Sequence, residues 1–240
     1  MLGVWSVVSV SSSALGARFT VSLAERLALR GVRVLLFELA PELPSLDVLL
    51  GVSEKVVYTL ADAREVTPER VLLTPCENLY FAPLGVGETV DEPASLFACM
   101  DEVKPDVVLL FAERSACSLA RSVSDGMLLL TDETAQSLRS AAALTEKHAF
   151  DGYVLTDLVP AREWIGRAPA LTEIADALGL PLFGILPRTD PNNTHLSSGK
   201  DFLSAVDNMA GRMMGEDIPL LRGIPTEGIR RKSFLARISK

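Results

Sequence analysis

The chain has 240 residues, a hydrophobic fraction of 48% and a formal net charge of −8. This length and apolar content suit one α/β domain with a large core, and they exclude an intrinsically disordered chain. An acidic chain lacks the positive surface that broad nucleic-acid binding requires, so we expect no nucleic-acid partner.

The 3 cysteines are widely spaced, and the 2 histidines lie far apart in the sequence. No C-x-x-C pair occurs, which fits buried thiols in a reducing compartment. The apolar runs have strand length, whereas a membrane-spanning helix needs about 20 apolar residues. The first residues also lack the pattern of a secretory signal peptide, so we expect a cytoplasmic protein, and no spacing indicates a metal site.

Apolar stretches of strand length alternate with amphipathic stretches along the chain. Strands are predicted at residues 4–10, 32–38, 79–82, 106–111, 127–131, 153–156 and 182–186. Helices are predicted at 17–30, 93–103, 115–124, 134–147, 170–178 and 199–214, with weaker structure over 45–66. Apolar strands separated by helices are typical of a parallel sheet covered on both faces. The sequence therefore predicts a doubly wound α/β fold, with the first strand central and the strand at 106–111 beside or near it.

The loop after the first predicted strand is where such folds bind anions, because it meets the N-terminus of a helix. Residues 11–20 read S-S-S-A-L-G-A-R-F-T. A P-loop needs G-x-x-x-x-G-K-[ST], and this segment does not match that pattern. Taken alone, the segment is most simply a serine-rich turn that caps a helix.

Four segments match one known family in order and spacing. They are V-L-L-F-E-L-A-P-E-L-P-S-L-D-V-L-L-G at 34–51, K-P-D-V-V-L-L-F-A-E-R-S at 104–115, G-L-P-L-F-G-I-L-P-R-T-D-P-N-N-T-H-L-S-S-G at 179–199 and A-V-D-N-M-A-G-R-M-M-G-E-D-I-P at 205–219. In these segments, across nearly its whole length, the chain resembles the MinD/ParA branch of P-loop ATPases. The resemblance implies a P-loop NTPase-like fold. It also implies a role in positioning division, segregation, flagellar or pilus machinery.

The chain departs from the family at the positions that carry its chemistry. By the resemblance, Ser12 and Ala17 replace the family's two lysines, Arg18 replaces the magnesium-binding Ser/Thr, and Ala40 and Phe111 replace two aspartates. Phosphoryl transfer depends on positioning and on charge neutralisation by lysine and Mg²⁺. We therefore expect no ATPase activity and assign no catalytic residue.

Two interpretations of the loop stay open. In the first, the site is collapsed, Phe111 packs as core and no cofactor binds. In the second, a vestigial phosphate loop still holds an anion or ATP without magnesium. The residues of that loop are Ser11, Ser12, Ser13, Gly16 and Arg18.

Two acids remain near the loop in this interpretation. Glu38, which by the resemblance stands for the first aspartate of the family's D-x-D, is expected to be a strand-end hydrogen-bonding group, and Asp47 a helix-start residue. Two alternative functions are weighed. An unusual ATPase of the same family would still bind nucleotide and switch dimerisation. An electron-transfer iron–sulfur protein of the same fold would need glycine-flanked cysteines, and Cys99 and Cys117 lack such neighbours.

The C-terminal segment 226–240 is predicted to be a basic tail after the α/β domain of residues 1–225. Residues 228–240 carry +5 and no acid; since the whole chain carries −8, residues 1–227 carry −13. Aromatic and aliphatic residues at helical spacing, with basic neighbours, resemble the C-terminal membrane-targeting helix of the family. They are Arg230, Arg231, Lys232, Phe234, Leu235, Arg237 and Ile238.

The resemblance in the tail implies peripheral contact with an anionic membrane surface from the cytoplasmic side. For the whole chain it implies protein partners of a positioning system and a homodimer. A tail that packs on its own acidic domain is the alternative.

Overall fold

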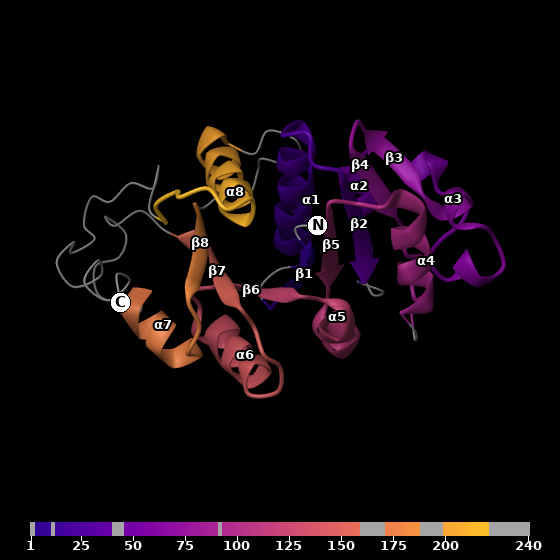
Figure 1. The fold of residues 1–240 in the computed structure, drawn as a ribbon. Helices are drawn as coiled ribbons and strands as arrows, with labels where there is room; N and C mark the ends of the chain where they lie inside the picture. The colour runs from indigo at the N-terminus through magenta and orange to yellow at the C-terminus, as the bar shows by residue number, and fades with distance from the viewer. Residues whose placement is uncertain are drawn as a thin grey trace.

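The computed structural model describes residues 3–10, 13–39, 46–90, 93–158, 171–187 and 199–220. In these ranges one sheet has the strand order β3-β4-β2-β5-β1-β6-β7-β8 (Figure 1). The strands are β1 (Gly3–Ser9), β2 (Val34–Leu39), β3 (Leu73–Cys76), β4 (Leu79–Ala82), β5 (Val107–Ala112), β6 (Gly126–Asp132), β7 (Gly152–Leu158) and β8 (Leu182–Pro187). β3 pairs antiparallel with β4, and the other pairs are parallel. The predicted mainly parallel sheet is confirmed, and β1 lies between β5 and β6.

Helices cover both faces of the sheet (Figure 1). They are α1 (Ser13–Leu29), α2 (Leu46–Leu49), α3 (Pro68–Val71), α4 (Ala94–Val103), α5 (Cys117–Val123), α6 (Ala135–Thr145), α7 (Leu171–Leu178) and α8 (Lys200–Met213). Short 3-10 turns lie at η1 (Ser53–Lys55), η2 (Asp62–Arg64) and η3 (Arg114–Ala116). Side chains of α1, α2 and α8 share one buried cluster, and those of α3 to α7 share the other. The fold is therefore three layers with two cores.

β5 shows why the strands are apolar along their whole length. Its six residues, V-V-L-L-F-A, are all fully buried. Because side chains alternate between the faces of a sheet, Val107, Leu109 and Phe111 enter the core under α1, while Val108 and Leu110 enter the opposite core. A strand with helices on both sides needs apolar residues at every position.

The structure differs from the expected elements at the first helix and at the sheet edge. α1 begins at Ser13, four residues before the expected start, so Gly16 lies in its first turn. The strand β3 and the helix α3 have no counterpart among the expected elements. β3 contains Pro75, which reads against a strand, but edge strands tolerate proline because one side makes no ladder hydrogen bonds.

Within the described ranges, no helix combines the length and the apolar composition that crossing a bilayer requires.

Candidate functional site

The carboxyl ends of β1, β5 and β2 lie side by side beneath the first turns of α1 and α2. Val7, Phe111 and Glu38 are register neighbours across these strands, so their side chains project to the same face of the sheet. All three are fully buried. This row occupies the edge where the sequence predicts a vestigial phosphate loop. The buried Phe111 agrees with the collapsed-site interpretation.

Gly16 is the point of closest approach between α1 and this row. A Cβ built on Gly16 would lie 2.6 Å from Ser9 Cβ and 2.8 Å from Phe111 Cε2. Such distances leave no room for a side chain, so Gly16 allows the helix to rest on the Phe111 ring. The Thr20 hydroxyl donates a hydrogen bond of 2.8 Å to the Gly16 carbonyl oxygen, one turn further along α1. The ring of Phe111 therefore fills the volume directly under the first turn of α1.

Ala17 and Arg18 follow Gly16 and differ in their surroundings. Ala17 is fully buried and belongs to the same apolar cluster as Phe111. The Arg18 guanidinium carbon lies 5.2 Å from the centroid of the Phe202 ring in α8, which is a cation–π contact. Burial lowers the pKa of Arg18, but an arginine in a protein stays protonated. The first turns of α1 thus retain a positive charge, which lies against Phe202 of α8.

Glu38 is a buried carboxylate at the end of β2. Its two carboxylate oxygens accept from the Leu46 N–H at 3.3 and 3.4 Å. Leu46 is the first residue of α2, so Glu38 holds the start of that helix. The predictions for Glu38, a strand-end hydrogen-bonding group, and for Asp47, a helix-start residue, are confirmed.

Further polar side chains at this edge bond to the backbone. The Thr156 hydroxyl at the end of β7 donates to the Thr131 carbonyl oxygen at 3.3 Å, and the Thr131 hydroxyl at the end of β6 donates to the Asp132 carbonyl at 3.2 Å. Both threonines are fully buried. They stabilise the ends of the strands.

Of the predicted site, the structure brings Gly16 into contact with Phe111 and places Arg18 against Phe202. Ser11, Ser12, Ala40 and the tail residues at 226–240 lie outside the described residues, as does the side chain of Ser13. The contact of Arg18 with Phe202 was not predicted, because no sequence pattern links residues so far apart. Over the ranges that the structure covers, no three His, Cys, Asp or Glu side chains gather in a way that could hold a metal ion.

The sequence is similar to curated MinD proteins. "Septum site-determining protein MinD" of Synechocystis sp. is 25% identical in an alignment 229 positions long, which covers 84% of this chain and 85% of that protein. The protein of the same name from Neisseria meningitidis serogroup B is 24% identical in an alignment 269 positions long, which covers 97% of each chain. No family model matches the sequence.

The fold is similar to solved structures of the same group. The MinD cell division protein of Aquifex aeolicus superposes with a TM-score of 0.76 at 21% identity, covering 90% of this chain and 99% of that one. The structure of the MinC:MinD complex from that organism has a TM-score of 0.74 at 22% identity, covering 90% of this chain and 98% of that one. A ParA family ATPase of Chlorobium tepidum has a TM-score of 0.60 at 15% identity, covering 92% of this chain and 95% of that one. The chain therefore has the P-loop NTPase-like fold of these proteins.

Proposed function

We propose, given that the chain belongs to the MinD/ParA family, that it positions or scaffolds other proteins without hydrolysing ATP. The observation that carries the proposal is the packing of Phe111 against Gly16, where a Cβ would be 2.8 Å from the ring. The ring is fully buried, so the end of β5 is part of the core.

The residues present do not fit a magnesium-bound nucleotide. Mg²⁺ is held in proteins by oxygen ligands, mainly carboxylates, hydroxyls and phosphates. Phe111 and the buried Ala17 offer none, and Ala17 has no charge for a phosphate. The carboxylate of Glu38 already accepts from the Leu46 N–H. By the resemblance, Arg18 stands where the family binds the metal ion, and its permanent positive charge would repel a cation there.

The proposed cellular role is a localisation role in cell division or partition. The solved relative from Aquifex aeolicus is described in a complex with MinC, and we extend the use of protein partners to this chain. The basic tail at 226–240 supplies the proposed contact with an anionic membrane surface, and a homodimer would present two tails. Without the switch groups of an ATPase, such a protein is either constitutively competent or controlled by its partner.

The test is calorimetry with ATP, with and without Mg²⁺, together with a phosphate-release assay on the full chain. We expect no turnover above background and no binding that depends on magnesium. Turnover that copurifies with the monodisperse protein and disappears in Arg18→Ala would contradict the proposal. An active MinD protein assayed in parallel is the positive control.

A matched pair of variants separates the two interpretations of the loop. If ATP binds without magnesium, Arg18→Met should abolish the binding and Arg18→Lys should retain part of it, because lysine keeps the charge. That result would establish the vestigial phosphate loop. Absence of binding in the wild-type chain would establish the collapsed site.

A further inference from the structure

The chain turns back on itself after α8. Gly215 has a φ of 86°, which only glycine adopts readily, and it places residues 215–220 against the last turn of the helix. The Glu216 N–H donates to the Gly211 carbonyl at 2.9 Å. A Cβ on Gly211 would lie 2.5 Å from Ile218 Cδ1, so the end of the Ile218 side chain lies directly against the helix backbone at Gly211. We call residues 215–220 the return segment.

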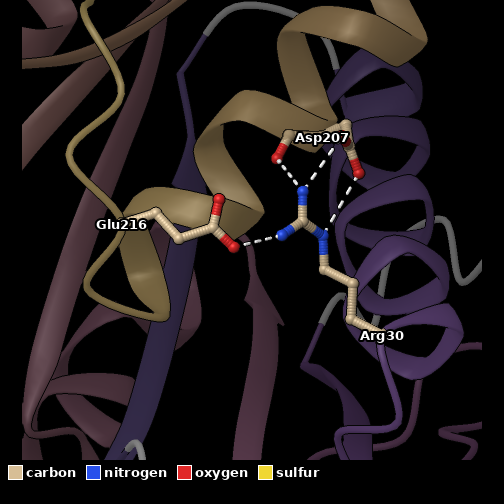
Figure 2. A network of polar contacts seen from close by, with 3 residues as sticks. All are labelled: Arg30, Asp207 and Glu216. Atoms are coloured by element: carbon tan, nitrogen blue, oxygen red, sulfur yellow. Dashed lines mark hydrogen bonds and ion pairs between the residues drawn. The ribbon is translucent and has the colours of Figure 1, made fainter.

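Arg30, the residue after α1, binds the beginning of the return segment. Its guanidinium donates to both carboxylate oxygens of Asp207 in α8, at 3.0 and 3.3 Å, and to one oxygen of Glu216 (Figure 2). The pKa of Arg30 is raised, chiefly by the hydrogen bond to Asp207. This network connects α1, α8 and the return segment through one side chain.

Arg212, in the last turn of α8, binds the end of the return segment. Its guanidinium donates to the carbonyl oxygens of Ile218, Pro219 and Leu220 at 3.0, 3.2 and 3.4 Å. A fourth bond of 2.6 Å reaches the Phe183 carbonyl in β8. Three consecutive carbonyls of the return segment therefore share one donor group.

Little apolar surface holds the return segment otherwise. Glu216, Asp217 and Pro219 are exposed, and Ile218 and Leu220 are only half-buried. The side chains of Arg30 and Glu216 are 25% and 46% exposed, so water and salt screen their attraction. Segments with few buried apolar contacts open at lower free energy than the core.

We propose that the return segment is a clasp that opens separately from the α/β body and that Arg212 keeps it closed. Residue 221 follows the clasp directly, so the clasp determines where on the body the basic C-terminal part begins. If residues 215–220 detached and extended, the C-terminal part could lie about 20 Å further from the body, at about 3.3 Å per extended residue. A change in tether length alters the effective concentration of whatever the tail binds. The inference goes beyond the proposed function, because it needs neither nucleotide nor a known tail partner.

Hydrogen exchange on the full chain tests the clasp. In the wild-type protein, amides of residues 215–220 should exchange faster than those of β1 and β5, and 1 M NaCl should increase the difference. Arg212→Ala should raise exchange in the return segment ~10-fold without changing β5, a factor typical of losing such contacts. Arg212→Lys should give a smaller increase, since lysine keeps the charge but not the planar set of donors.

Arg121→Ala is the matched control, because Arg121 is a half-exposed arginine whose ion pair, with Asp151, lies away from the clasp. Glu216→Gln is a second variant that removes only a surface charge, and it should also raise exchange in residues 215–220. The proposal is overturned if the return segment exchanges only together with β1 and β5 in the wild-type chain. It is also overturned if Arg212→Ala does not raise exchange there.

Discussion

Asp125 and Val4 exchange two hydrogen bonds at the amino edge of the sheet. The Val4 N–H donates to the Asp125 carboxylate, and the Asp125 N–H donates to the Val4 carbonyl, both at 2.8 Å. Asp106 pairs in the same way with Arg33, and Asp151 with Met127. Each aspartate stands one residue before a parallel strand, so its carboxylate satisfies the free N–H at the start of the neighbouring strand.

Asp125→Ala should destabilise the fold by about 1–2 kcal/mol, because it leaves the part-buried N–H of Val4 without its acceptor. Asp125→Asn should cost less, since the amide oxygen still accepts. Urea unfolding measures both values. Asp101→Ala, at an exposed position in α4, is the control and should be nearly neutral. Equal losses for the Ala and Asn variants would show that the hydrogen bond is not the cause.

Gly16→Ala should destabilise the protein by about 1–3 kcal/mol, because its new methyl group would overlap Ser9 and the ring of Phe111. Phe111→Leu removes part of that overlap. The double variant should therefore lose less than the sum of the two single losses, which a double-mutant cycle in urea detects. Strict additivity would mean that the two residues do not press on each other.

The sequence predicted the sheet well because its strands are apolar throughout. β4 (Leu79–Ala82) has the predicted bounds, and β5 differs from its prediction by one residue at each end. The aspartates that pair across the amino edge stand in P-D-V, S-D-G and F-D-G, directly before β5, β6 and β7 and within two residues of the predicted strand starts. β3 was missed because an edge strand with alternating exposure and a proline has no apolar run.

Long-range contacts at the candidate site could not be predicted from the sequence. The residue type at 111 indicated the loss of a carboxylate, but its contact with Gly16 depends on how α1 crosses β5. The contact of Arg18 with Phe202 depends likewise on the packing of α1 against α8. Such distances follow from helix placement, which periodicity alone does not determine.

Glu25→Gln should make the protein more stable near neutral pH. Burial raises the pKa of Glu25 in α1, and the charge of Arg26 opposes that shift only in part. A carboxyl group with a raised folded-state pKa favours folding at low pH, and that advantage is lost as pH rises through the folded pKa. The variant should therefore flatten the decline in stability as pH rises above the ordinary pKa of a glutamate, as urea midpoints at each pH will measure. Glu102→Gln, at an exposed position, is the control; an identical profile for both variants would contradict the prediction.

Thiol labelling should distinguish Cys76 from the other two cysteines. Cys76 is exposed, whereas Cys99 and Cys117 are buried and burial raises the pKa of each to about 11. Because the thiolate is the reactive form, Ellman's reagent should label one thiol in the native protein and all 3 after denaturation. Cys76→Ser should remove the native signal. Labelling of more than one native thiol would indicate that the cores open on the timescale of the reaction.

The tail prediction rests on the sequence of residues 226–240. The +5 charge of 228–240 contrasts with −13 over residues 1–227, and Phe234, Leu235 and Ile238 have helical spacing. Each buried apolar side chain contributes roughly 1.5–3 kcal/mol at most, and each basic residue near an anionic leaflet adds about 1 kcal/mol. Ordering the segment costs a comparable amount, so one copy should bind weakly.

The full chain should cosediment with anionic vesicles more than with neutral ones, and added salt should weaken the binding because it screens the surface field within about 8–10 Å. Phe234→Asp should reduce binding further, since a charge replaces an apolar ring at the interface. Phe97→Asp adds the same charge at an exposed phenylalanine of α4 and should leave binding nearly unchanged. ATP should have little effect, because the proposed protein does not switch with nucleotide.

If the tail instead packs on its own acidic domain, removing residues 226–240 should lower stability without changing sedimentation. Equal sedimentation of the intact and truncated proteins with anionic vesicles would thus exclude the membrane contact.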